Sequence, residues 1–353
     1  MRVLKLKSLS LASASAALIV SNTIQTATAA NFNPAPIYQD FGKYSTTISG
    51  NNDLTDIYFP KTKNSNSNNK SFPVALLLQG ANVDKSSYSQ YASIVARYGF
   101  IVVVPNRKRT ITQFDRTGLF AETSQVENIL AQIETEKSKP NSPIKGIVNT
   151  DKLALLGHSW GGAVGLSAIA NLCRPGVCEG SFERPDKLVA GIFFGTSLRR
   201  QPTDEFIPIN NSGIPTALLQ GTKEGVALPF RAKGTYDNIQ NPPKALITIS
   251  GANHYGITNK NNPDGPRPDP SNPTIPQDVA VETAARWSGL FLRASVFNDK
   301  QAFDYVYSTG DALDKNVKVT SQVKSVPKTS SIFGLGLFSI GFMMWKSKVS
   351  KNK

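Results

Sequence analysis

The segment 157–162, with the sequence GHSWGG, constrains the fold of this chain more than any other feature. It follows the apolar run 153–156 and precedes the small apolar residues 163–166, so it is expected to form a strand, a sharp turn and a helix in that order. A serine between glycines in such a turn has a strained backbone and an exposed hydroxyl, the arrangement called a nucleophile elbow. We therefore predict that Ser159 is a nucleophile.

The histidine content leaves one candidate for the general base. The chain contains two histidines, His158 and His254. His158 lies inside the elbow and is expected to point away from the serine. A serine nucleophile needs a neighbouring base to take its proton. His254, which follows a predicted strand at 245–249, is therefore the expected base.

Both ends of the chain have the pattern of processed segments. Residues 1–29 begin with basic residues, continue through an apolar stretch and close on an A-x-A pattern, as in a secretory signal peptide. Residues 326–353 contain an apolar run at 332–345 and a lysine-rich tail, an order that resembles a degenerate PEP-CTERM sorting signal. A sorting protease is then an expected partner; the alternative is a membrane anchor through 332–345. Either interpretation exports the domain at 30–325 to the periplasm, cell surface or medium.

The positive charge of the chain is concentrated at these ends. The formal net charge is +14, of which the first 30 residues carry three charges and residues 326–353 carry five, which leaves +6 for the rest. No basic stripe interleaved with aromatic residues is found, so we expect no nucleic-acid partner.

Cys173 and Cys178 are the two cysteines of the chain. In the oxidising environment that export implies, they are expected to close a small disulfide loop. Two thiols without a nearby histidine cannot fill a zinc coordination shell, so a metal site here is disfavoured.

Strands with continuous apolar sequence alternate with amphipathic helices. Strands are expected at 44–49, 56–59, 74–78, 100–104, 153–156, 188–194, 216–220 and 245–249, and helices at 88–98, 122–137 and 279–297. The strand at 245–249 is expected to be the last. This alternation predicts an α/β fold with a mostly parallel central sheet and helices on both faces. The proline-rich segment 259–276 is expected to be an irregular loop, either at the mouth of the site or a surface insertion.

Three stretches resemble the α/β-hydrolases: LQGA at 78–81, YSQY at 88–91 with YGFI at 98–101, and the elbow at 157–162. The resemblance extends from about residue 40 to about residue 300 and is greatest to the chlorophyllase, dienelactone-hydrolase and polyester-hydrolase group of esterases. It implies hydrolysis of a small-molecule or polymeric ester through an acyl-enzyme, with no metal and no organic cofactor.

The same resemblance assigns the remaining site residues. Glu224 stands where these hydrolases usually have aspartate, and its carboxylate can orient the imidazole of the base. Asp237 and Asp204 are the alternatives for this role. The oxyanion hole is expected to consist of the backbone N–H groups of Trp160 and Ala81.

Two other functions fit the same sequence. An acyltransferase would use the same triad and pass the acyl group to an alcohol instead of water. A non-catalytic surface-binding protein could also have this fold, although the serine and histidine are both retained.

Overall fold

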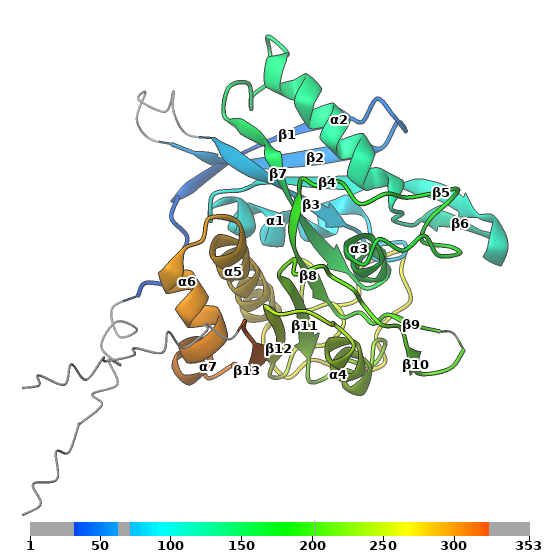
Figure 1. Ribbon diagram of the computed structural model, residues 1–353, viewed down its shortest axis with the longest axis vertical. Coiled ribbons are helices and arrows are strands. Elements are labelled where there is room, and N and C mark those ends of the chain that lie inside the picture. Colours follow the sequence, from blue (N-terminus) through cyan, green and yellow to red (C-terminus); the bar gives the residue numbers. More distant parts are fainter. Residues whose placement is uncertain (1–31, 63–70, 201, 325–353) are drawn as a thin grey trace, which may run out of the picture. The chain divides into compact units, whose positions relative to one another are not determined.

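A computed structural model describes residues 32–62, 71–200 and 202–324 of the chain (Figure 1). The expected signal peptide at 1–29 and the expected sorting or anchoring segment at 326–353 lie outside the described residues. These two assignments, and the domain limits that depend on them, remain predictions.

A nine-stranded sheet forms the centre of the described part of the chain. Its strands, in spatial order, are β1 (Asp40–Thr47), β2 (Leu54–Lys61), β4 (Ile101–Asn106), β3 (Phe72–Leu78), β7 (Val148–His158), β8 (Leu188–Phe194), β11 (Thr216–Gly221), β12 (Lys244–Ile249) and β13 (Val317–Gln322). The pairs from β4 to β12 are parallel, whereas β1, β2 and β13 join antiparallel at the two edges. The mostly parallel sheet predicted from the sequence is confirmed.

The apolar runs occupy the middle of this sheet because both faces there are covered. Every residue of β3 is buried, and so is every residue of β11. The prediction that the strand at 245–249 is the last was wrong, since β13 pairs antiparallel with β12. Exposed residues alternate with less exposed ones along β13, which lies at the edge of the sheet. β13 therefore lacks the continuous apolar run by which the central strands were predicted.

Helices cover both faces of the sheet. The α-helices of the described residues are α1 (Ser89–Ala96), α2 (Ser124–Ser138), α3 (Trp160–Ile169), α4 (Pro229–Asp237), α5 (Gln277–Val296), α6 (Lys300–Asp304) and α7 (Gly310–Leu313). Buried side chains of α1 and α5 share one apolar cluster with Ala75 and Leu77 of β3. Those of α2, α3 and α4 share the other cluster with Leu76 and Leu78. Successive residues of β3 thus point to opposite faces of the sheet. Figure 1 shows the helices on the two faces.

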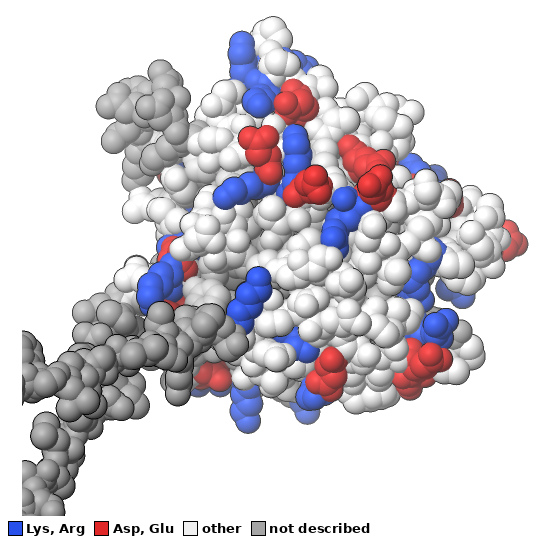
Figure 2. Space-filling view, viewed as in Figure 1, with Lys and Arg blue, Asp and Glu red and all other residues white. Residues whose placement is uncertain are grey.

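Two short hairpins lie outside the central sheet and were not predicted. They are formed by β5 (Lys108–Ile111) with β6 (Arg116–Leu119), and by β9 (Arg199–Arg200) with β10 (Glu205–Phe206). Basic and acidic side chains are interspersed on the face shown in Figure 2. That face therefore has no large area of one charge sign; the expectation of no nucleic-acid partner remains a prediction.

Candidate active site

Ser159 lies at the tight junction between β7 and α3. Its backbone has φ 52° and ψ −116°, a conformation that is strained for a residue with a side chain. Neighbouring groups hold it there: the Ser159 N–H donates to the Phe194 carbonyl at 2.9 Å, and the Thr196 hydroxyl donates to the Ser159 carbonyl at 2.8 Å. The strand, sharp turn and helix predicted for 157–162 are thus present in the structure.

Glycine is required at the turn because backbone atoms approach it closely. A Cβ at Gly161 would lie 2.1 Å from the Leu78 carbonyl oxygen, and one at Gly157 would lie 2.9 Å from the Gly161 carbonyl oxygen. The absence of these side chains lets the start of α3 pack against the end of β3. The loop that follows β3, which contains Ala81, is therefore brought toward the elbow.

Ser159, His254 and Glu224 form a continuous hydrogen-bonded chain. His254 Nε2 lies 2.9 Å from Ser159 Oγ, and His254 Nδ1 forms a short hydrogen bond with Glu224 Oε1. Glu224 follows β11 and His254 follows β12, and the carboxyl ends of parallel strands meet at one edge of a sheet. Ser159 is half-buried, whereas His254 and Glu224 are only 2% and 4% exposed. This geometry suits a serine nucleophile, a histidine base and a carboxylate that orients the base.

The carboxylate of Glu224 is held in a restricted space. Oε1 also accepts the Ala227 N–H at 3.2 Å, while Oε2 has no hydrogen-bond partner among the described residues. A Cβ at Gly195 would lie 3.0 Å from Oε2 and 3.1 Å from His254 Nδ1, and Gly195 has φ 57°. Gly195 thus leaves room for the acid and base side chains. Sequence reasoning missed it because its role is to leave this volume empty.

The two alternative acids lie elsewhere in the structure. Asp237 is exposed and pairs with Lys233 within α4, and Asp204 is exposed and pairs with Arg231. Neither carboxylate forms a hydrogen bond with His254 in the described part of the chain. Of the three candidates named from the sequence, the structure brings Glu224 to the imidazole.

The two candidate oxyanion donors are the backbone N–H groups of Trp160 and Ala81. Within residues 32–62, 71–200 and 202–324, neither N–H donates to a protein acceptor. Both Trp160 and Ala81 are half-buried beside the elbow rather than enclosed in the core. Among the described residues, each N–H is thus without a protein acceptor, as an oxyanion-hole donor must be before substrate binds.

His158 is buried beside His254 and does not bond to Ser159. Its Nε2 lies 2.9 Å from the His254 carbonyl oxygen, and since a carbonyl only accepts, Nε2 carries the proton. Nδ1 then accepts from the Tyr88 hydroxyl at 2.9 Å, and that hydroxyl oxygen accepts the Gly80 N–H at 2.9 Å. Both ring nitrogens of His158 are thus occupied, whereas His254 Nε2 faces Ser159 Oγ. Sequence reasoning did not identify Tyr88 as the link between His158 and the loop of Ala81.

The environment of His158 makes the stability of the fold dependent on pH. Burial, followed by electrostatic repulsion between the two adjacent imidazoles, lowers the pKa of His158 well below its usual 6.5, so the folded protein keeps this ring neutral. The unfolded chain binds a proton below pH 6.5, so stability is fully present above that pH and falls as the pH decreases. We expect His158 to lower the free energy of unfolding by about 1 kcal/mol between pH 7.5 and 5.5.

Urea denaturation of the wild type and of His158→Gln at both pH values measures this contribution. The wild type should lose more stability on acidification than the variant, by the amount given above. An equal loss in the two proteins would contradict a buried neutral His158.

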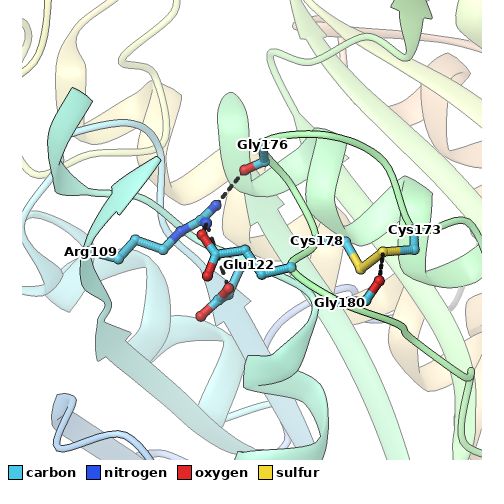
Figure 3. The surroundings of a disulfide bond; sticks show 7 residues. Arg109, Glu122, Cys173, Gly176, Cys178 and Gly180 are labelled. Carbon is cyan, nitrogen blue, oxygen red and sulfur yellow. Dashed lines mark hydrogen bonds and ion pairs between the residues drawn. A yellow bond between two sulfur atoms is a disulfide. The ribbon is translucent and has the colours of Figure 1, made fainter. Parts of the chain in front are cut away.

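Cys173 and Cys178 form a disulfide in the structure, with their Cα atoms 5.1 Å apart. The loop that it closes contains the Gly176 carbonyl, which accepts a short hydrogen bond from the guanidinium of Arg109 (Figure 3). Arg109 also donates to the Ala121 carbonyl, the same oxygen that accepts the indole N–H of Trp160 at 2.9 Å. The disulfide loop is thus connected through Arg109 and Ala121 to Trp160, the residue that follows Ser159.

Removal of the disulfide is expected to destabilise the fold. The free energy of unfolding of the double variant Cys173→Ser/Cys178→Ser should be about 2 kcal/mol lower than that of the wild type. The loss is moderate because a loop this short restricts the unfolded chain only moderately. Denaturant titration under non-reducing conditions measures the change. A reductant should lower the wild type to the level of the variant and leave the variant unchanged; equal stability of both proteins without reductant would contradict the prediction.

Two further findings concern other kinds of site. In the described ranges, no helix is both long and apolar enough to cross a membrane. Within those residues, no group of three or more His, Cys, Asp or Glu side chains is placed to hold a metal ion.

Comparison with known proteins identifies two similarities. The family model for chlorophyllase matches residues 47–173, a segment that contains Ala81 and Ser159 but ends before Glu224 and His254. The protein Cutinase est2 of Thermobifida alba is 23% identical over 208 residues, which is 58% of this chain and 58% of the cutinase. The alignment thus spans less than two thirds of the cutinase.

Proposed function

We propose that this chain, which has the α/β-hydrolase fold, is an exported carboxylic-ester hydrolase with the triad Ser159, His254 and Glu224. The observation that carries the proposal is the continuous hydrogen-bonded chain from Ser159 Oγ through the imidazole to the Glu224 carboxylate. Similarity to chlorophyllases and to a cutinase supports an ester as the substrate.

The reaction begins with acyl transfer to the serine. Ser159 Oγ attacks the ester carbonyl carbon while its proton passes to His254 Nε2, and the carbonyl oxygen becomes an oxyanion. Collapse of this intermediate breaks the bond to the alcohol oxygen, which takes the proton from His254 and leaves. Glu224 accepts the Nδ1–H throughout, which fixes the tautomer and stabilises the imidazolium.

Hydrolysis of the acyl-enzyme completes the cycle. Water gives a proton to His254 Nε2 and attacks the acyl carbon, and the acid leaves as the proton returns to Ser159 Oγ. In both halves the N–H groups of Trp160 and Ala81 would donate to the oxyanion. One such donor typically lowers the barrier by about 3 kcal/mol.

The protein is exported in this account, and its substrate is a small-molecule or polymeric ester. Export is supported by the basic and apolar pattern of residues 1–29 and by the Cys173–Cys178 disulfide, because disulfides persist in oxidising compartments. Similarity to a cutinase and the chlorophyllase match support a small-molecule or polymeric ester as the substrate. Because both alignments cover only part of this chain, the substrate remains part of the proposal.

A series of p-nitrophenyl esters from acetate to long-chain acyl groups tests the proposed activity on the full-length protein. We expect release of p-nitrophenol at a rate that has an optimum at one acyl length, which measures the size of the acyl site. The absence of turnover on every ester, with a folded protein, would contradict the proposal. Addition of a primary alcohol tests the acyltransferase alternative, because a transferase would form the new ester faster than the free acid.

A further inference from the structure

The loop at 259–276 packs against the elements that bear the candidate catalytic residues. A Cβ at Gly265 would lie 2.7 Å from the carbonyl oxygen of Asn82, next to Ala81. The Asn253 side chain donates to the Ser271 carbonyl at 2.9 Å, directly before His254. This segment, drawn mainly in yellow in Figure 1, connects β12 to α5. It is therefore more than a surface insertion.

Asp269, in this loop, accepts hydrogen bonds from the loop that bears His254 and from the loop that bears Glu224. Its Oδ2 accepts the backbone N–H of His254 at 2.8 Å and the backbone N–H of Gly225 at 3.2 Å. Its Oδ1 accepts the Ser271 N–H at 2.8 Å. Asp269 is 4% exposed, and no lysine or arginine pairs with it in the described part of the chain. Its carboxylate is thus held by three backbone donors.

The residue at position 225 must be small for this contact to form. A Cβ at Gly225 would lie 2.4 Å from Asp269 Oδ1 and 2.6 Å from Ser271 Oγ. Gly225 directly follows Glu224, so the contact lies one residue from the candidate acid. The backbone at Gly225 can approach the carboxylate only because it lacks a side chain.

We infer that Asp269 is a positioning residue, whose carboxylate oxygen fixes the backbone of the base relative to the backbone of the acid; this inference rests on the proposed function. Glu224 and His254 belong to separate loops that follow different strands. Their side chains align only if these two loops keep a constant separation. A single Oδ2 atom that accepts one N–H from each loop sets that separation, and hydrogen bonds to a charged acceptor are the stronger kind.

Loss of this carboxylate should affect the chemical step more than substrate binding. Asp269→Ala is expected to lower kcat by about 100-fold with little change in KM, because small displacements of catalytic groups cost rate. Asp269→Asn retains a carbonyl oxygen that can accept from His254 and Gly225 but loses the acceptor for Ser271. We expect it to lower kcat by only about tenfold.

The test uses the full-length protein and two measurements of the site. The first is kcat and KM for p-nitrophenyl butyrate, and the second is the rate constant for modification of Ser159 by a fluorophosphonate. Asp264→Ala is the matched control, since Asp264 belongs to the same loop but is exposed and pairs only with Lys260 among the described residues. Thermal unfolding of each variant establishes that it is folded at the assay temperature. If Asp269→Ala does not fold, Asp269→Asn provides the comparison with the control.

Both rates should fall by the same factor in each Asp269 variant and stay unchanged in Asp264→Ala. An Asp269→Ala protein with wild-type kcat and wild-type fluorophosphonate reactivity would overturn the inference, as would an effect confined to KM. A wild type that reacts with the fluorophosphonate but hydrolyses no ester would contradict the proposed function alone, because the second measurement still tests Asp269. A wild type inactive in both would overturn both proposals.

Discussion

Ser159→Ala is expected to lower kcat for ester hydrolysis by about 10⁶-fold, because the acyl-enzyme cannot form without the hydroxyl. The fold should be preserved, since alanine removes one oxygen from a half-buried side chain. The hydrogen bonds of the backbone at position 159 to the Phe194 carbonyl and the Thr196 hydroxyl are kept. Steady-state hydrolysis of p-nitrophenyl butyrate by the full-length variant measures the loss.

Ser138→Ala is the control for this variant. Ser138 is exposed on α2 and its hydroxyl donates to the Thr135 carbonyl of the same helix. This variant should retain wild-type kcat. Both variants are purified so that no host esterase contaminates them. If Ser159→Ala then kept more than a small fraction of the wild-type rate, another residue would be the nucleophile.

Glu224→Gln is expected to lower kcat by about 10⁴-fold. The carboxamide can still approach His254 Nδ1, but its NH₂ group donates to Nδ1 and so favours the tautomer in which Nε2 bears the proton. In that tautomer Nε2 cannot accept a proton from Ser159. The amide also lacks the negative charge that stabilises the imidazolium. KM should change little, since Glu224 is buried behind the imidazole and away from the substrate. The same steady-state assay measures both constants.

Asp237→Asn and Asp204→Asn are the matched controls, because both carboxylates were candidates from the sequence. Each side chain is exposed and pairs with a cationic side chain, so removal of either negative charge should leave kcat unchanged. A large loss in one of these controls, with Glu224→Gln active, would assign the role of the acid to a different carboxylate.

The positions of the central strands could be predicted because their sequence reflects burial on both faces. The run at 74–78 identified β3, and the segment 188–194 matched β8 at both ends. β13 was missed because an edge strand that faces solvent has no such run, and its polar residues Lys318 and Thr320 are exposed. The short hairpins were missed for a similar reason, since their strands are too few in residues to show a period.

The candidate site divides in the same way between local and tertiary information. Ser159 could be recognised because the elbow is a local motif, and His254 followed from the histidine content of the chain. The sequence left the acid open among three residues, since a carboxylate on any of several loops could reach the imidazole. Only the packing of the loops after β11 and β12 places Glu224 at Nδ1.

For residues that act through the backbone, the sequence alone did not reveal the role. Gly195 and Gly225 are needed for the space that they leave, and Asp269 and Tyr88 act by accepting backbone N–H groups. Each of these roles depends on which distant segment is adjacent. The proline-rich segment 259–276 could be predicted as a loop, but its contact with His254 required the fold.

Modification of the full-length protein by a fluorophosphonate, followed by peptide mass mapping, tests the central claim most directly. Such reagents react with a serine hydroxyl that an adjacent base activates. We expect one adduct per chain, located on Ser159, and its formation should be lost in His254→Ala. A folded protein that forms no adduct, or that carries it on another residue, would contradict the assignment of Ser159 and His254 as nucleophile and base.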